Sequence, residues 1–168
     1  STSWKYPIYN ISSHSINFLE VHDNYSFNDY IRFSLKLNKK DDLIIDHIDH
    51  IELNEVQSKI NKLGALILLT SKGVPLIHQG QEWGHSQIIA ETDYPDPNIG
   101  KMDRNPYNKD NETNWVNWHE LDVNNELLEY YKNLITIRRS FSALRDTNNQ
   151  KIDFISYSNR TLGYFIDD

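Results

Sequence analysis

The sequence predicts an α/β fold organised around a pair of parallel strands. Two short apolar runs, residues 16–21 and 74–77, each end in a cluster of polar side chains. Between them, apolar residues recur every three or four positions from Leu53 to Ile67, which is the spacing of an amphipathic helix. Such a helix is the kind of crossover that joins two parallel strands, so both polar clusters are expected at the same edge of the sheet.

The first apolar run delivers His22, Asp23 and Asn24 directly at its end. Ligands and catalytic groups gather at the carboxyl ends of strands in parallel α/β layers, so this turn is the first candidate site. The run itself suits a buried strand. The tripeptide taken alone favours a capped strand end with a solvated polar turn over a site. Motifs later in the chain reverse that preference.

The next elements follow in order along the chain. Ser26 resembles a helix cap, and Phe27, Tyr30 and Ile31 begin an apolar stripe at helical spacing. The long helix is predicted to run up to Gly73. The second strand then has its proline close to the start, where a missing backbone N–H is tolerated.

The second half of the chain changes character twice. Residues 84–125 are rich in Asn, Asp and Pro and lack regular periodicity, which is typical of a functional loop. Residues 125–145 return to helical spacing and end in arginines, which suit the negative end of a helix dipole. Residues 151–157 and 161–166 alternate and predict a β-hairpin.

The composition argues against nucleic-acid binding, cysteine chemistry and a membrane span. The 168 residues suit one globular domain, and the net charge of −7 leaves no basic surface for nucleic acid. The chain has no cysteine, which excludes disulfides, thiolate metal sites and a cysteine nucleophile. No apolar stretch of about 20 residues suggests a membrane span. The start lacks an initiator Met, which suggests a processed or excised piece. For the location of the protein, we slightly favour the extracellular space or the periplasm.

Several motifs together carry a family resemblance. Residues 18–24 (FLEVHDN) and 73–82 (GVPLIHQGQE) resemble the last two barrel-strand motifs of the α-amylase superfamily, glycoside hydrolase family 13. Three later segments are similar to the following loop and final barrel helix of its pullulanase-like debranching members: residues 104–108, 114–118 and 131–139. A lone HDN is a weak signal, but several motifs in one order are a strong one.

The resemblance implies an architecture. Residues 1–147 would be the C-terminal part of a catalytic TIM (β/α)8 barrel, comprising its seventh and eighth βα units, and residues 148–168 would begin a C-terminal β-sandwich domain. A whole barrel takes about 250 residues, so the N-terminal part of the barrel is expected as a partner. The family's nucleophilic Asp and acid/base Glu lie on earlier strands, which predicts that this chain alone is inactive.

The same resemblance assigns candidate site residues for an α-glucan substrate. Asp23 matches the family's third catalytic carboxylate, which would stabilise the positive charge that develops on the sugar in an oxocarbenium-like transition state. His22 would hydrogen-bond sugar hydroxyls. Tyr107, Asn111 and Asn114 are further substrate-binding candidates, although Asn111 stands where debranching relatives usually carry a carboxylate.

Metal sites have weaker signals. His47 and His50 lie three positions apart, but the preferred interpretation is a solvated helix start because further ligands at recognisable spacing are missing. The acidic segment 93–98 could offer oxygen ligands to calcium but lacks EF-hand spacing, so a solvated loop is preferred. No cofactor or metal is expected in this segment, whereas calcium could bind in a complete enzyme.

Four further side chains are interpreted as structural. Trp83, Trp115 and Trp118 could stack on sugar faces, but we predict that each belongs to a core. Glu82 follows the second strand and resembles a catalytic carboxylate, yet its family counterpart is structural.

The first interpretation is a retaining α-glucan hydrolase that acts on starch, glycogen or pullulan-type polysaccharides with α-1,6 debranching specificity. An endo-acting α-1,4 α-amylase is the near alternative. A non-catalytic carbohydrate-binding homologue would differ from both because its upstream strands would lack the nucleophile and the acid. The number of ordered motifs disfavours an autonomous α/β domain with accidental matches.

Overall fold

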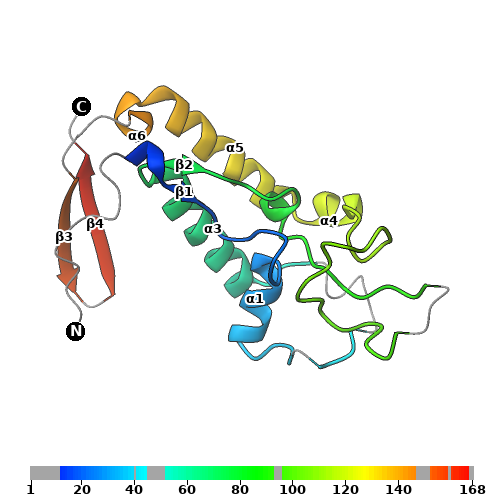
Figure 1. Cartoon of the computed structure of the whole chain (residues 1–168). Coiled ribbons are helices and arrows are strands. Elements are labelled where there is room, and N and C mark those ends of the chain that lie inside the picture. Colours follow the sequence, from blue (N-terminus) through cyan, green and yellow to red (C-terminus); the bar gives the residue numbers. More distant parts are fainter. Residues whose placement is uncertain are drawn as a thin grey trace, which may run out of the picture.

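The computed structural model describes residues 12–39, 41–44, 52–92, 96–146, 152–158 and 160–166. Its helices and strands follow in the order η1 (Ser12–His14), β1 (Ile16–Asn17), α1 (Phe27–Ser34), α3 (Glu55–Thr70), β2 (Val74–Pro75), η2 (Gln81–Trp83), α4 (Trp118–Val123), α5 (Asn125–Ser140), α6 (Ser142–Arg145), β3 (Ile152–Ser158) and β4 (Thr161–Ile166) (Figure 1). The order contains the predicted strand, long helix and second strand.

The strands β1 and β2 pair in parallel, as the sequence predicts. Ile16 lies opposite Val74 and Asn17 opposite Pro75. The backbone N–H of Val74 donates to the carbonyl of Ser15 at 2.8 Å, in line with this register. Each strand has two residues, so both are shorter than the apolar runs that predicted them. The parallel pair nevertheless sets the direction in which both runs end.

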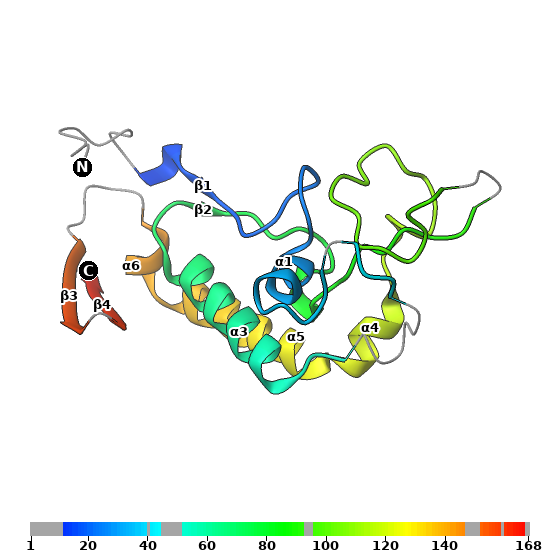
Figure 2. The same cartoon turned by 90° about the horizontal axis from the view of Figure 1, so that it is seen from below.

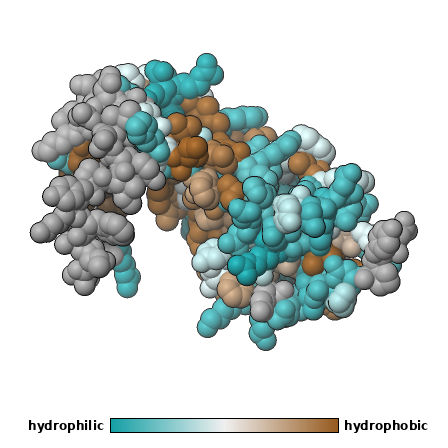
Figure 3. Space-filling view, viewed as in Figure 1, coloured by the Kyte–Doolittle hydropathy of each residue, from teal (hydrophilic) through white to brown (hydrophobic). Residues whose placement is uncertain are grey.

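Burial of the first strand was predicted and is wrong for this chain. Ile16 is 61% exposed, Phe18 52% and Val74 47%. Figure 2 shows the cause, since α3 and α5 lie side by side along one face of the β1–β2 pair. A pleated pair that is covered on one face leaves its alternate side chains outside the core. In the space-filling view, brown apolar side chains accordingly reach the surface between hydrophilic regions (Figure 3).

Local capping explains where the first two helices begin. The Ser26 hydroxyl accepts a hydrogen bond from the Asp29 N–H at 3.1 Å, which confirms the predicted cap of α1. At α3, the Asn54 side chain accepts from the Gln57 N–H, and the Gln57 side chain accepts from the Asn54 N–H, both at 3.0 Å. This reciprocal capping box satisfies donors that an uncapped helix start would leave unpaired.

The main core lies between the long helices. It contains Ala65 and Leu69 of α3 together with Leu127, Tyr131 and Leu134 of α5. The helix α1 packs against α3 at Gly64, where an added Cβ would lie 2.7 Å from the Phe27 ring. A larger residue at this position would therefore separate the two helices.

The last helical segment departs from the prediction in two ways. The expected single helix over 125–145 is interrupted at Phe141, which has extended backbone angles and separates α5 from α6. The Arg138 side chain does not bind the carbonyl groups at the end of its own helix. Its guanidinium instead donates to the carbonyls of Leu69 and Ser71 at 2.8 Å and of Gly73 at 2.7 Å. Arg138 therefore fastens α5 to the end of α3 and to the turn before β2.

The predicted C-terminal hairpin is present. The strands β3 and β4 pair antiparallel, with a register shift between Ser156 and Ser158. Figure 1 shows the hairpin beyond α6, at one end of the α3–α5 pair. A hydrogen bond between the hydroxyls of Thr70 and Tyr164 links it to the end of α3.

The long segment between η2 and α4 is largely irregular, as predicted. Among its described residues, an isolated antiparallel bridge joins Ile88 and Met102, and these two side chains form a small second core with Ile44 and Tyr25. Among the described residues, none of the helices has the length and apolar character that crossing a membrane requires.

Candidate functional site

A buried carboxylate joins the ends of the two strand segments. Glu20 is 4% exposed and lies just before the polar turn that follows β1. It accepts a hydrogen bond from the Phe27 N–H, and its Oε1 lies 3.2 Å from Nδ1 of His78, beyond β2. These partners offset the cost of burying the carboxylate. Glu20 therefore holds both strand ends at one edge, although sequence reasoning assigned it no role.

The turn after Glu20 brings three predicted site residues together. Nε2 of His22 lies 3.0 Å from Oδ1 of Asp23, and the two side chains are 64% and 73% exposed. The ring of Tyr107 lies beside His22, with 6.4 Å between ring centroids and planes tilted by 55°. Carboxylate oxygens, an imidazole and an aromatic ring thus converge at an accessible surface. Such a set can bind hydroxyl groups and one sugar face.

Two neighbouring side chains, those of Asn24 and Glu82, make contacts within their own turns. Oδ1 of Asn24 accepts a hydrogen bond from the Tyr25 N–H at 3.1 Å, so this side chain fixes the turn. Oε2 of Glu82 accepts from the Gly80 N–H at 3.0 Å. Gly80 has a φ of 100°, and a Cβ there would lie 2.6 Å from the Cβ of His85. The second polar turn is therefore fixed by its own backbone contacts.

Asn111 and Asn114 lie on the same loop as Tyr107 but engage that loop itself. Oδ1 of Asn111 accepts a hydrogen bond from the Thr113 N–H at 3.0 Å. The Asn114 side chain is exposed, and the backbone N–H of Asn114 donates to the Asn111 carbonyl at 2.9 Å. Asn111 also lines a hollow with Ala90, Thr113 and other residues of the irregular segment. The Asn111 side chain and the Asn114 backbone thus shape the loop that presents Tyr107.

The three tryptophans divide between core and surface. Trp83 is 3% exposed, so its predicted core position is confirmed. Trp115 and Trp118 are 56% and 60% exposed, so the core prediction is wrong for both in this chain. The Trp118 ring packs on Trp83 with 5.5 Å between centroids, whereas Trp115 donates through Nε1 to Asp110 at 3.3 Å. Their segment runs over the surface, which leaves large parts of both rings open.

A buried histidine and glutamate form a pair that sequence reasoning missed. Nδ1 of His85 donates to Oε2 of Glu120 at 2.6 Å, and the two side chains are 4% and 3% exposed. The Ser86 N–H donates to the other Glu120 oxygen at 3.2 Å. Burial lowers the pKa of His85, but the hydrogen bond and charge of Glu120 outweigh it and leave the pKa above its usual value. The partners lie 35 positions apart, so no local pattern could have joined them.

A second buried ionic pair lies within α1. Nη1 of Arg32 and Oδ1 of Asp29 are 3.9 Å apart, and the side chains are 2% and 0% exposed. Burial raises the pKa of Asp29 against the opposing charge of Arg32, and burial lowers the pKa of Arg32. The predicted apolar stripe is wrong at Tyr30, which is 56% exposed. The helix turns a partly polar face inward because Asp29 accepts the Gln87 N–H at 2.8 Å.

The described residues offer no group of three or more His, Asp or Glu side chains arranged to hold a metal ion. His47 and His50 lie outside the described residues, as do residues 93–95 of the acidic segment. In the rest of that segment, Oδ1 of Asp96 accepts the Asn98 N–H at 2.8 Å, and Oδ2 lies 3.9 Å from the Lys109 ammonium. Asp96 is thus engaged within the protein.

The chain was compared with known proteins. No family model matches it. It is 29% identical over 147 residues to pullulanase of Bacillus subtilis (strain 168), which covers 86% of this chain and 17% of that protein. It is 30% identical over 146 residues to isoamylase of Flavobacterium sp, covering 80% of this chain and 17% of that protein. The chain therefore spans about a sixth of the length of these relatives.

Solved structures agree with the sequence matches. A crystal structure of pullulanase type I from Bacillus subtilis str. 168, complexed with maltose, superposes with a TM-score of 0.69 at 23% identity. The superposition covers 94% of this chain and 19% of that one. These comparisons confirm the resemblance to debranching members of the α-amylase superfamily and show that the chain has the fold of part of a pullulanase.

Proposed function

We propose that this chain is part of a retaining glycoside hydrolase that cleaves α-1,6 branch points in α-glucans. The chain is a homologue of pullulanase and isoamylase, which are debranching members of the α-amylase superfamily. The carrying observation is the convergence of His22, Asp23 and Tyr107 at the strand-end edge that Glu20 fixes. The maltose in the related Bacillus subtilis structure supports a neutral glucan as the ligand.

The proposed architecture is the C-terminal part of a (β/α)8 barrel over residues 1–147, followed by a β domain from residue 148. Two observations support it. A long helix joins the parallel strands β1 and β2, as in two successive βα units. The chain then changes from helices to the antiparallel hairpin β3–β4 after α6. In this proposal the exposed side chains of β1 and β2 pack against strands that precede this chain in the complete barrel.

Asp23 is the proposed catalytic residue of this segment. Three carboxylates follow the two strands closely, but Glu20 and Glu82 already accept hydrogen bonds from backbone N–H groups. Asp23 projects from its turn with its carboxylate accessible. It can therefore face a substrate and stabilise the positive charge that develops on the sugar ring.

The other predicted residues bind substrate in this proposal. His22 donates or accepts hydrogen bonds to sugar hydroxyls, and its contact with Tyr107 places an aromatic ring at the same surface. Asn111 has its side-chain oxygen engaged by Thr113, which leaves its amide N–H groups for a hydroxyl. Asn114 is exposed on the same loop and offers a second amide.

The 168 residues alone are expected to give no detectable hydrolysis of α-glucans. A retaining mechanism needs two carboxylates about 5 Å apart, one as nucleophile and one as acid/base. At the described strand ends, Asp23 is the carboxylate left accessible. Incubation of the pure 168-residue chain with pullulan, amylopectin or maltooligosaccharides tests this expectation. Measurable turnover would show that the chain carries its own nucleophile and acid.

The full-length protein is expected to hydrolyse pullulan faster than amylose. Pullulan offers α-1,6 linkages, and relatives matched by sequence are named pullulanase and glycogen debranching enzyme. Initial rates on the two polymers, measured at equal concentration of glucose units, distinguish a debranching enzyme from the alternative functions. A preference for amylose would favour an endo-acting α-amylase, and binding of both polymers without turnover would favour a non-catalytic homologue.

A further inference from the structure

The turn between β1 and α1 has no backbone hydrogen bonds of its own. In the part of the chain that the structure describes, residues 20–25 neither donate a backbone N–H to another backbone group nor accept one. The side chains of His22, Asp23 and Asn24 are exposed, and the bond from the Tyr25 N–H to Asn24 lies within the turn. The position of this turn therefore depends on side-chain contacts at its two ends.

The side chain of Glu20 closes the turn. Its Oε2 accepts a hydrogen bond from the backbone N–H of Phe27, the first residue of α1. This bond joins the residue before the turn to the residue after it, so residues 21–26 form a closed loop. Its Oε1 lies 3.2 Å from Nδ1 of His78, which follows β2. The carboxylate thus has a partner on each of two segments, and a shift would break one of the contacts.

The α1 side of this loop is anchored in the protein. Ser26 is 2% exposed, its carbonyl accepts the Tyr30 N–H at 2.9 Å, and Tyr25 packs against the small second core. On the β1 side, Glu20 is the buried residue closest to Asp23, three positions before it. Its carboxylate links this side of the loop to the anchored side. The position of Asp23 therefore depends on that link.

We propose that Glu20 is a positioning residue for the hydrolysis, because its carboxylate sets where Asp23 meets the substrate. This inference rests on the proposed hydrolase function and adds a second carboxylate with a different role. Glu20 is 4% exposed and both of its oxygens have protein partners, so it acts through Asp23 and not on the sugar. Misplacement of a reacting group by about 1 Å can cost about 10²-fold in rate, so the position of Asp23 matters for turnover.

The test compares two conservative variants of the full-length protein. Glu20→Asp keeps the charge but is one methylene too short to reach both partners, whereas Glu20→Gln keeps the reach and loses the charge. Glu20→Asp is expected to lower kcat on pullulan about 10- to 100-fold, and Glu20→Gln is expected to stay within about threefold of the parent. A larger kcat loss for Glu20→Gln than for Glu20→Asp would overturn the proposal.

A double-mutant cycle shows whether Glu20 acts through Asp23. In the Asp23→Asn background, Glu20→Asp is expected to lower kcat by no more than about threefold, which is the part that acts through His22 on the same turn. A residue with a purely structural role would cause the same fold loss in both backgrounds. Equal fold losses in the parent and in the Asp23→Asn protein would therefore overturn the proposal.

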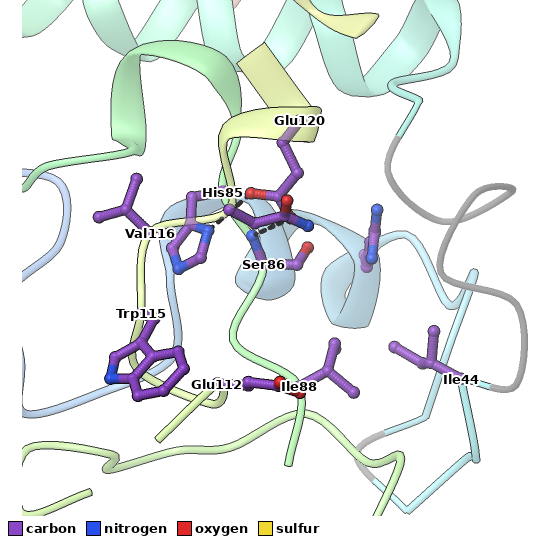
Figure 4. Close-up of a pocket in the computed structure, with 10 residues that line it drawn as sticks. Ile44, His85, Ser86, Ile88, Glu112, Trp115, Val116 and Glu120 are labelled. Atoms are coloured by element: carbon purple, nitrogen blue, oxygen red, sulfur yellow. Dashed lines mark hydrogen bonds and ion pairs between the residues drawn. The ribbon is translucent and has the colours of Figure 1, made fainter. Parts of the chain in front are cut away.

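The pair of His85 and Glu120 provides a matched control. Figure 4 shows Glu120 with its hydrogen bonds to the His85 ring and to the Ser86 N–H, the same two kinds of partner that Glu20 has. Glu120→Asp shortens this second buried carboxylate and is expected to lower the melting temperature while leaving kcat unchanged. Equal kcat losses for Glu20→Asp and Glu120→Asp would show a general loss of packing and would contradict a positioning role.

Hydrogen exchange tests the same link without any turnover. The Phe27 amide donates to Glu20, so its exchange is measured in the full-length protein without substrate. Glu20→Asp is expected to speed this exchange about tenfold, and Glu120→Asp is expected to leave it unchanged. Unchanged exchange in Glu20→Asp would overturn the positioning role. If the parent failed to hydrolyse pullulan, the hydrolase proposal would be wrong, while the exchange rates would still decide whether Glu20 holds the turn.

Discussion

Replacing Asp23 by Asn in the full-length protein is expected to lower kcat by about 10²- to 10³-fold, which is the usual effect of removing one preorganised electrostatic group from a transition state. The amide keeps the shape of the carboxylate but loses its charge. Since the charge on the sugar develops only in the transition state, KM is expected to change much less than kcat. Steady-state kinetics on pullulan measures both values.

The stability of the Asp23→Asn protein is expected to match that of the parent. Asp23 is 73% exposed, and its described ionic partner is the adjacent His22. Thermal melts of both proteins test this, with the exposed Asp122→Asn in α4 as a matched control that leaves kcat unchanged. A normal kcat for Asp23→Asn, or activity lost only through unfolding, would contradict the catalytic role.

A second variant at the same turn separates binding from charge stabilisation. His22 contacts Tyr107 and is proposed to bind hydroxyls both before and during the reaction. His22→Ala is therefore expected to raise KM and to lower kcat, unlike Asp23→Asn. If the two variants shared one kinetic signature, the division of roles between His22 and Asp23 would be wrong.

Local signals in the sequence were sufficient for much of the fold. The Ser26 cap and the regular apolar spacing from Leu53 to Ile67 depend on contacts within a few positions, and both helices form where they were predicted. The parallel pairing of β1 and β2 followed from the order of elements, because a long helix between two strands leaves few other arrangements.

Long-range contacts and burial were not predictable in the same way. Tyr30 belonged to the apparent apolar stripe of α1, yet the helix buries Asp29 and Arg32 because Gln87 supplies a backbone donor to Asp29. The exposure of Trp115 depends on how its loop crosses the surface. The loop has no regular spacing of apolar residues from which this exposure could be predicted. Residue type alone overestimated the burial of side chains on the two-stranded β1–β2 pair and on this surface loop.

In the candidate site too, the residues found from the sequence carry local signals, and the residues that were missed are joined by a long-range contact. His22 and Asp23 were found because they follow a strand directly, and Tyr107 was found through a motif. Glu20 and His78, which fix the two strand ends together, gave no signal, because their contact joins positions 58 residues apart. Sequence reasoning thus identified the groups that face outward and missed the buried Glu20 and the partly buried His78 that hold the strand ends together.

The buried pair of His85 and Glu120 is expected to carry the largest stability effect in the chain. It connects the turn after η2 with α4, and both side chains are almost fully enclosed. Removing one member leaves the other buried without its partner, which typically costs about 3–5 kcal/mol. Glu120→Ala is therefore expected to lower the free energy of unfolding by that amount in chemical denaturation. Glu55→Ala, which breaks an exposed pair with Lys59, is the matched control and is expected to cause no measurable change.

The contribution of the His85–Glu120 pair to stability is expected to depend on pH. Because the pKa of His85 is raised in the folded protein, the stabilisation is fully present below the unfolded value of about 6.5 and is lost as pH rises through the folded pKa. Glu120→Gln keeps a hydrogen-bond acceptor but removes the charge, so its stability is expected to fall less over this range. Asp29 also has a raised pKa, but it is unchanged in both proteins, so their difference isolates the pair. Parallel pH profiles for parent and Glu120→Gln would show that His85 is neutral throughout and that Glu120 acts only as an acceptor.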